Sequence, residues 1–297
     1  MKRVFGVCLR GWLILCGVSL VVQLAGAEEV VVVLSSDSPA YREALAGFEK
    51  EYGHPVPTFT LSKGNVHLPD SAKVFVAIGG TAATFSYPAR STLIYCLAPS
   101  VERFAGADEG LRVNVRVSSA PDIVLAKLKS LQPSLKRLSI FWINPALNQI
   151  FRDFESAARP LGIELRAIHV ERPEGVPEAL RALKDKTDAL WFIPDPMLMT
   201  PGIFTMTKEF ASANGVPFYV PIDALVDKGA TASVSSSFWE MGRLSGKLAA
   251  KAADGKLGDA ARVYPQKVIV TINLTAAAQS GLTIPEDMKK KADRVVP

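Results

Sequence analysis

Short apolar runs alternate with amphipathic stretches along the chain, which is the pattern of a parallel sheet with helices between its strands. Val30–Leu34 is an uninterrupted β-branched run and predicts a buried strand. The polar turn after it ends at Pro39, which suits the first turn of a helix over 41–52. Further strands are predicted at 73–78, 91–97, 111–117, 136–143, 163–170, 189–193, 216–220, 232–235 and 267–274. Further helices are predicted at 121–131, 147–161, 176–183, 200–213, 238–253 and 276–281.

The order of these elements predicts the fold class. The strand–helix rhythm restarts after residue 120, so two successive doubly wound units fit the chain. We therefore expect an α/β fold with two doubly wound parallel-sheet lobes. Ligands bind at the carboxyl ends of the strands in such sheets, and two lobes whose strand ends face each other form a cleft.

Polar residues follow the predicted strands of the first lobe and are candidates for ligand binding. They are Ser35, Ser36, Asp37, Tyr41, Gly80 and Thr81. The serine hydroxyls and the helix start after them suit a carboxylate, but helix capping explains them equally. Asp37 suits an amine, or simply favours the helix dipole. Gly80 and Thr81 permit close backbone approach, and Tyr41 is either a stacking wall or a half-buried helix residue.

The candidates of the second lobe are Asn144, Asn148, Asp195, Asp223 and Phe238. Capping explains one of the two asparagines at a helix start, but not obviously both. Asp195 lies between two prolines, and Asp223 ends the next strand, so either could bind an ammonium group or pair with a cation across the cleft. These two rank highest among the acids. Of Phe238 and its neighbour Trp239, we expect one to line the cleft and the other to pack in the core.

The N-terminus predicts export. Residues 1–27 combine a cationic start, an apolar run shorter than the roughly 20 residues of a spanning helix, and the cleavage sequence Ala25-Gly26-Ala27. An uncleaved anchor is the alternative. Beyond this segment only Cys96 remains, in an apolar run, so we expect a buried inert thiol and no internal disulfide. An exported chain without disulfides suggests a bacterial periplasm.

Composition and missing motifs narrow the function. With 48% hydrophobic and 21% charged residues, 297 residues form a large core and are not disordered. The formal net charge of +5 falls to +2 without the three cations of the signal segment, which gives no case for nucleic-acid binding. Strong catalytic motifs are absent, and the three histidines lack metal-ligand spacing, so we expect neither a metal nor another cofactor. Gly242 to Gly246 faintly suggests a phosphate loop but fits tight helix packing better.

Several segments resemble a known family in their order and spacing. They are residues 74–83, 138–165, 188–201 (DALWFIPDPMLMTP), 214–233 (NGVPFYVPIDALVDKGATAS), 235–255 (SSSFWEMGRLSGKLAAKAADG), 272–286 and 292–296. Together they resemble the ABC-transporter substrate-binding proteins of the TrpX-like type, a branch of the type I periplasmic binding proteins. The resemblance spans most of the chain after the signal segment and is sharpest in its C-terminal half.

The resemblance implies an architecture and a mechanism. It implies two lobes joined by three hinge crossings, lobe one covering 28–118 with 238–258 and lobe two covering 119–237 with 259–297. It implies a non-enzymatic, monomeric protein that closes on a small solute, aromatic amino acids included, and docks on an inner-membrane ABC permease. Three departures reduce lobe one: a short segment at 53–73, Pro88 inside a helix, and Ala98-Pro99-Ser100 in place of an Asp-Pro turn.

Three hypotheses follow. The first is a periplasmic solute-binding component of an ABC importer that captures its ligand by hinge closure. The second is a periplasmic sensory or partner-binding module with the same fold, which the reduced first lobe favours. The third is an exported α/β enzyme, against which the missing nucleophile–base constellation argues.

Overall fold

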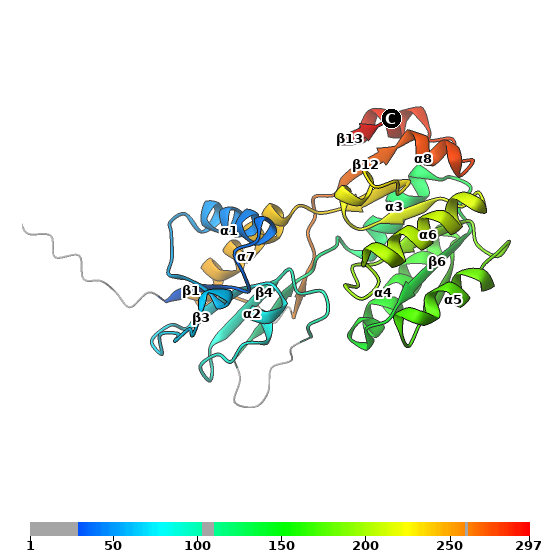
Figure 1. Cartoon of the computed structure of the whole chain (residues 1–297). Helices are drawn as coiled ribbons and strands as arrows, with labels where there is room; N and C mark the ends of the chain where they lie inside the picture. The colour runs from blue at the N-terminus through cyan, green and yellow to red at the C-terminus, as the bar shows by residue number, and fades with distance from the viewer. Residues whose placement is uncertain (1–28, 103–109, 259–260) are drawn as a thin grey trace, which may run out of the picture.

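Two α/β lobes make up the part of the chain that the computed structural model describes, residues 29–102, 110–258 and 261–297 (Figure 1). The predicted signal peptide, 1–27, lies outside the described residues. Each lobe is built on one sheet whose central strands are parallel, which confirms the predicted fold class. The last residues of the chain lie in lobe two, while the second-lobe sheet is entered only after residue 120 (Figure 1).

The sheet of lobe one is parallel in every described strand pair. Its order is β11-β5-β4-β3-β1-β2. The strands are β1 (Val30–Leu34), β2 (Thr58–Thr60), β3 (Val74–Ile78), β4 (Thr92–Cys96), β5 (Arg112–Val115) and β11 (Arg262–Val263). Its helices are α1 (Pro39–Tyr52), α2 (Gly80–Thr84) and α7 (Phe238–Ala253). Helices α1 and α7 lie side by side on one face, where alternate strand residues form a core with them.

The second face of this sheet carries little helix. Its apolar side chains, among them Phe75 and Tyr95, pack under α2 and under the loops around Leu68 and Tyr87. As the short segment predicts, the described residues from Gly53 to Lys73 hold only β2 and one turn of 3-10 helix, Leu61–Lys63. Helix α2 ends at Thr84, before Pro88 is reached, so it is shorter than an ordinary sheet-covering helix.

The sheet of lobe two has helices on both faces. Its order is β13-β12-β10-β9-β8-β6-β7, and β12 runs antiparallel to β10. The strands are β6 (Arg137–Trp142), β7 (Glu164–His169), β8 (Ala189–Phe192), β9 (Phe218–Val220), β10 (Ala232–Ser235), β12 (Ile269–Asn273) and β13 (Arg294–Val296). Its helices are α3 (Pro121–Leu131), α4 (Asn148–Ala158), α5 (Val176–Ala182), α6 (Pro201–Ala213), α8 (Leu274–Gln279) and α9 (Glu286–Lys291). Separate apolar cores lie on the two faces, one with α3, α4, α8 and α9 and one with α5 and α6.

The chain passes between the lobes after β5, after β10 and after β11. The predicted last boundary, between 258 and 259, is corrected by β11, because Arg262 and Val263 pair with β5 of the first sheet. The crossings are joined by serines: the Ser119 and Ser236 hydroxyls lie 3.1 Å apart, and the Ser236 hydroxyl donates to the Lys267 carbonyl at 3.3 Å. These contacts hold the three crossings together at one place.

Helices α1 and α7 approach closely because glycines face the contact. A Cβ on Gly242 would overlap the backbone of Ala44, and one on Gly246 would lie 2.7 Å from the Phe48 carbonyl oxygen. Gly47 on α1 has the same role against the Trp239 carbonyl. The interpretation of Gly242 to Gly246 as a helix-packing motif is therefore confirmed.

Cys96 is a buried free thiol at the end of β4, as predicted. Burial raises its pKa to about 12, and a hydrogen bond with Ser245 offsets only part of that rise. The thiolate, which is the reactive form, is therefore scarce at neutral pH.

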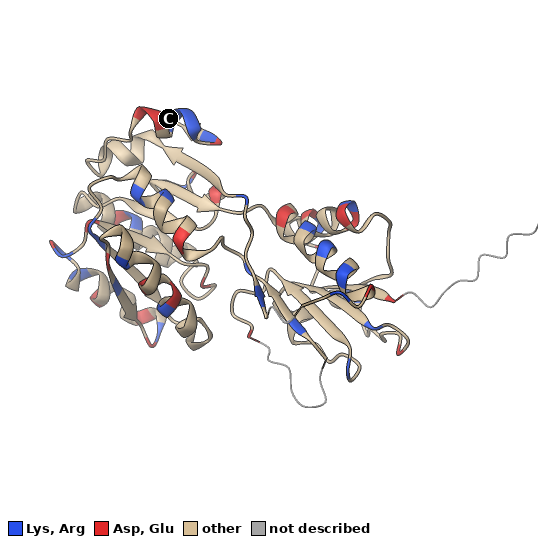
Figure 2. Cartoon of the chain, turned by 180° about the vertical axis from the view of Figure 1, so that it is seen from behind, with Lys and Arg blue, Asp and Glu red and all other residues tan. Residues whose placement is uncertain are grey.

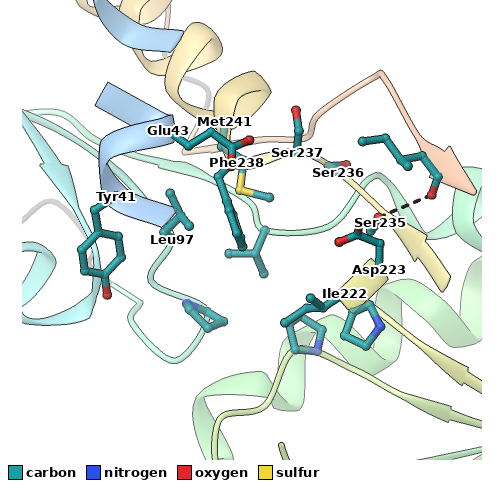
Figure 3. Close-up of a pocket in the computed structure, with 15 residues that line it drawn as sticks. Tyr41, Glu43, Leu97, Ile222, Asp223, Ser235, Ser236, Ser237, Phe238 and Met241 are labelled. Atoms are coloured by element: carbon teal, nitrogen blue, oxygen red, sulfur yellow. Dashed lines mark hydrogen bonds between the residues drawn. The ribbon is translucent and has the colours of Figure 1, made fainter. Parts of the chain in front are cut away.

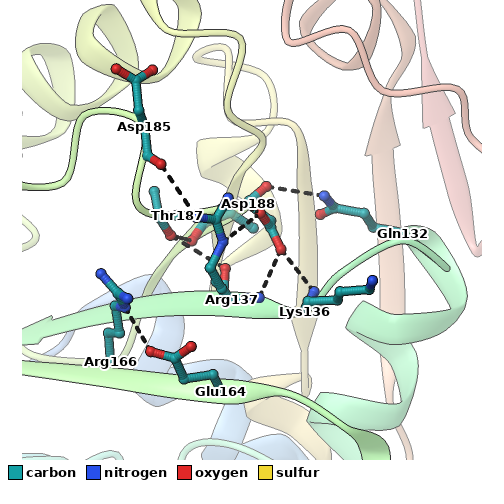
Figure 4. A network of polar contacts seen from close by, with 9 residues as sticks. Gln132, Lys136, Arg137, Glu164, Arg166, Asp185, Thr187 and Asp188 are labelled. Atoms are coloured by element: carbon teal, nitrogen blue, oxygen red, sulfur yellow. Dashed lines mark hydrogen bonds and ion pairs between the residues drawn. The ribbon is translucent and has the colours of Figure 1, made fainter.

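A polar network joins the start of β6 to the end of the loop that leads into β8 (Figure 4). Asp188 accepts hydrogen bonds from the backbone N–H groups of Lys136 and Arg137, at 2.9 and 2.8 Å. The Arg137 guanidinium adds two more, from Nε at 3.0 Å and from Nη2 at 2.7 Å. Burial raises the pKa of Asp188, but these hydrogen bonds and the Arg137 charge together outweigh it and lower the pKa.

We expect Asp188→Asn to remove a pH-dependent part of the stability of lobe two. Because the folded pKa lies below the unfolded value of about 3.9, the carboxylate stabilises the fold above that value and ceases to do so as pH falls through the folded pKa. Urea unfolding at neutral pH should therefore show the variant less stable than the parent, and the difference should shrink at about pH 3. A difference that stays constant over this range would contradict the role of the charge.

Candidate functional site

A cavity of about 400 Å³ lies between the lobes, beside the crossings (Figure 3). Both lobes contribute to its walls, as do the crossings after β5 and after β10. The lining residues are Tyr41, Glu43, Leu97, Pro99, Val117, Pro194, Pro221, Ile222, Asp223, Ser235, Ser236, Ser237, Phe238, Met241 and Ile269. Its size falls in the range of small-molecule sites.

Lobe one supplies an apolar wall with two polar groups. Phe238 and Met241 lie one turn apart at the start of α7, so they share a face and both line the cavity (Figure 3). Leu97 follows β4 with a φ of 51°, the left-handed region that L-residues seldom adopt, and such strain gathers at functional loops. Tyr41 and Glu43 come from the first turn and a half of α1.

Tyr41 presents a protonated hydroxyl. Burial, and to a smaller extent the nearby Cys96, raises its pKa, while a hydrogen bond with Ser35 pulls the pKa the other way. A phenol of ordinary pKa, about 10, is already neutral at physiological pH, and the shift moves it further from ionisation, so the cavity meets a neutral ring whose hydroxyl is held by Ser35.

The opposite wall comes from the strand ends of lobe two. Pro194 follows β8, while Pro221, Ile222 and Asp223 follow β9, as expected for ligand sites of parallel sheets. Asp223 begins a turn of 3-10 helix, Asp223–Leu225, and is exposed. Its backbone carbonyl accepts a hydrogen bond from Arg294 at 3.2 Å, which fixes the turn and leaves the carboxylate at the cavity.

The serines between β10 and α7 are already engaged. The Ser235 hydroxyl lies 3.5 Å from the Ile269 carbonyl, and Ser237 accepts a hydrogen bond from the Glu240 N–H and so caps α7. Together with Ser236 in its contacts with the other crossings, they form a polar hinge, in which the Ser237 hydroxyl is used as an acceptor and keeps its O–H to donate.

The charges at the cavity are negative. Its lining residues include Glu43 and Asp223 but no lysine, arginine or histidine. Glu43 also accepts a hydrogen bond from the Trp239 N–H at 3.1 Å. Elsewhere in the described chain both signs of charge are spread over both lobes (Figure 2), and Arg294, outside the lining, lies against Asp223.

Three of the eleven predicted site residues line the cavity: Tyr41, Asp223 and Phe238. Trp239, expected in the core, is instead 37% exposed. The other eight lie outside the lining, and ligand binding by the serines, Gly80 and Thr81 stays a prediction. Asp37 is exposed and lies 3.5 Å from Arg42 and 3.3 Å from Lys63, so it pairs with surface cations.

At the end of β3 it is Gly79, and not Gly80, whose lack of a side chain lets other residues pack closely against the backbone. Gly79 has a φ of 101°, and a Cβ there would lie 2.6 Å from the Ser35 hydroxyl oxygen and 2.7 Å from that of Tyr41. Gly80 has open space at the same position. Ser35 in turn accepts a hydrogen bond from the Ala82 N–H at 2.8 Å, so its hydroxyl holds the start of α2.

Asp195 has a structural role, which corrects its prediction as a binder of ammonium groups. Its side chain is fully buried, and it accepts hydrogen bonds from the N–H groups of Ile143, Asn144 and Met197 at 2.7, 3.0 and 3.0 Å. The carboxylate thus joins the two loops that follow β6 and β8. The prolines on either side of Asp195 therefore flank a carboxylate that bonds to loop backbone and does not line the cavity.

The two asparagines also have local partners. Asn144 accepts a hydrogen bond from the Ala146 N–H at 2.9 Å, which is helix capping. Asn148 accepts one from the Trp142 indole at 2.7 Å. Capping does not explain Asn148. Its hydrogen bond instead orients Trp142, which stacks on Phe151.

Most of the lining was missed because it is apolar or lies on the crossings. Val117 and Ile269 were predicted only as strand residues, and Ser235 to Ser237 only as a crossing. Met241 follows Phe238 by three residues on one helix, a spacing that could have identified it. Glu43 offered no signal beyond its place in the first turns of α1.

Comparisons with known proteins agree with this architecture. The family described as ABC transporter substrate binding protein matches residues 121–296. Among solved structures, a conserved domain protein from Vibrio cholerae is 18% identical with a TM-score of 0.62, over 90% of this chain and 98% of that one. A Streptococcus pneumonia ABC domain in complex with L-Trp has 18% identity and a TM-score of 0.61, over 90% and 100%. A ligand-free, open substrate-binding protein with adhesive properties from Clostridium difficile has 15% identity and a TM-score of 0.63, over 91% and 99%.

The curated proteins and the described helices add one negative result each. A search of curated proteins gave no significant match. Among the helices that the structure describes, none has both the length and the apolar character that a bilayer crossing requires.

Proposed function

Since the chain belongs to the ABC transporter substrate-binding protein family, we propose that it captures a small solute with a largely apolar body in the inter-lobe cavity and closes on it by hinge motion. The family is one of non-enzymatic binding proteins, as predicted, and the chain is a substrate-binding component of an ABC transporter. The observation that carries the proposal is the cavity itself, because residues of both lobes and of two crossings line it.

Hinge closure is supported by the way in which the lobes are joined. The crossings are held together by Ser119, Ser236 and the Lys267 carbonyl, so a small rotation there moves one wall of the cavity toward the other. A solute that touches both walls favours the closed state, because only that state offers it both sets of contacts.

The place of action and the partner belong to the same proposal. We infer an exported, monomeric protein of the periplasm that delivers its solute to an ABC permease of the inner membrane. The signal-like sequence of residues 1–27 supports export. The L-Trp complex of the streptococcal relative supports an amino acid or a related compound as solute.

A screen of purified protein tests solute capture. Amino acids, short peptides, nucleosides, small carboxylates and small amines are added in a thermal-shift assay, and hits are followed by small-angle scattering. A ligand at about 100 times its dissociation constant should stabilise the protein by about 2.7 kcal/mol and reduce the radius of gyration.

The matched variants are Ile222→Trp and Met197→Trp. Ile222 lines the cavity, so a tryptophan there should fill it and abolish the ligand-induced shift. Met197 is 42% exposed outside the lining, so the same enlargement there should leave the shift unchanged. Equal shifts in both variants would place binding elsewhere.

A second candidate, a sensory or partner-binding module, is favoured by the reduced first lobe. One face of its sheet is covered by α2 and loops instead of full helices. A well-folded protein that no compound in the screen stabilises would favour this candidate over solute capture.

A further inference from the structure

We propose that the cavity takes an organic cation, an amine with an apolar or aromatic body and no carboxylate. The inference rests on the proposed function, because it names the chemical class of the solute for the same cavity. It stands on the placement of two carboxylates, on the pairing of Arg116 in an adjoining cavity and on the apolar walls.

The two carboxylates of the lining belong to opposite lobes. Glu43 is on α1 of lobe one, and Asp223 follows β9 of lobe two (Figure 3). Hinge closure brings these walls together and excludes water, so the repulsion between two negative charges grows as the lobes close. A cation held between them replaces this repulsion by attraction. It therefore binds the closed state more strongly than the open one, which is the condition for a ligand to drive closure.

A carboxylate on the ligand would find no cationic partner. None of the lining residues is positively charged. Arg116 lines a small adjoining cavity that shares Pro99, Val117 and Pro194 with the main one. Its side chain, however, is 5% exposed and its Nη1 lies 2.7 Å from Glu102.

Arg116 is further tied by the residues beside it. The second Glu102 oxygen lies 3.5 Å from Arg262, so the carboxylate bridges two arginines of neighbouring strands. The charge of Arg116 is thus already compensated inside the protein, although its Nε has no hydrogen-bond partner among the described residues, and breaking the ion pair for a ligand would be strongly unfavourable. An amino-acid carboxylate would thus enter the cavity beside Glu43 or Asp223 without a cation of the lining to pair with, and only neutral donors such as the serine hydroxyls would face it.

The remaining walls suit the body of such a cation. Tyr41 and Phe238 offer aromatic faces, and Met241 offers a polarizable thioether (Figure 3). Aromatic faces attract cations as well as apolar groups, most strongly where water is excluded. The same side chains would accept an aromatic or alkyl body on the amine.

Pairs of compounds that differ only in the carboxylate test the inference. Tryptamine is compared with L-tryptophan, and phenethylamine with L-phenylalanine, by isothermal titration calorimetry at low and moderate salt. We expect each amine to bind at least tenfold more tightly than its amino acid, and the amine affinity to fall as salt rises.

Charge-neutral variants assign the preference to the two acids. Asp223→Asn and Glu43→Gln should each lower amine affinity about tenfold and narrow the gap between amine and amino acid. Asp254→Asn is the matched control, because it removes the same charge from an exposed carboxylate that pairs with Lys256 outside the cavity. It should leave both affinities unchanged.

The outcomes separate this inference from the function on which it rests. An amino acid, neutral or anionic compound that binds as tightly as the amines, with its shift lost in Ile222→Trp, overturns the cation preference and leaves solute capture standing. An amine preference that survives Asp223→Asn and Glu43→Gln also overturns it. If no compound of the panel or of the wider screen binds, solute capture fails and the inference fails with it.

Discussion

Replacing Gly242 by valine should destabilise lobe one by about 3 kcal/mol, near the upper end of the usual range for overpacking. Any Cβ at this position overlaps the Ala44 backbone, and backbone cannot turn aside as a flexible side chain does. Helix α7 must then move away from α1, which loosens the core formed by Ala44, Phe48 and Met241. Urea unfolding followed by circular dichroism measures the loss.

Gly202→Ala is the control for the Gly242 variant. Gly202 also lies in a helix, α6, but a Cβ there meets no atom within 4 Å. Alanine lowers the entropy of the unfolded chain, so this variant should be neutral or up to about 1 kcal/mol more stable. Equal losses for the two variants would show that glycine itself, and not the helix contact, is what matters.

Asp195→Ala should destabilise lobe two by about 3 kcal/mol, because backbone N–H groups that lose their partner each cost about 1–3 kcal/mol when buried. The carboxylate is the acceptor for three such groups on two loops, and the N–H of Ile143 is fully buried. Asp195→Asn keeps one carbonyl oxygen and should lose less. Chemical unfolding of the three proteins measures the order.

Asp223→Ala is the comparison for Asp195. Both acids follow neighbouring strands and ranked alike by sequence, but Asp223 is exposed and its side chain caps no loop. Its removal should change stability by less than about 0.5 kcal/mol and act on binding instead. A loss as large as that of Asp195→Ala would show that Asp223 has a structural role as well.

The fold could be predicted because its signals are local. Buried parallel strands are continuous apolar runs, so β1, β3 and β10 were located within one residue of their ends. Helix α7 was located to the residue, since Ser237 caps it and its apolar face is periodic. The strands that the sequence did not predict, β2, β11 and β13, have only two or three residues, too few to show an alternation of apolar and polar positions. They form because the edge strand beside each of them has backbone groups free to pair.

The site could be predicted only in part, because it depends on where strand ends come to lie in space. The rule that ligands bind at strand ends pointed to Asp223 and to Asp195 equally. The structure distinguishes the two acids by where their side chains lie. Asp223 lines the cavity, whereas Asp195 is hydrogen-bonded to loop backbone. The direction of Asp195 depends on Ile143 and Asn144, which lie 52 and 51 residues away in sequence, and no local pattern contains them.

The position of α7 has a consequence for the order in which the chain folds. Lobe one consists of two separate stretches, and α1 finds its partner helix only some 200 residues later in the chain. Lobe two, by contrast, gathers most of its sheet from one continuous stretch, 121 to 235. During synthesis from the N-terminus, the face of α1 with Ala44 and Phe48 stays uncovered until α7 has been made. Contacts this distant in sequence form slowly, so lobe one should be the last part to acquire its native structure.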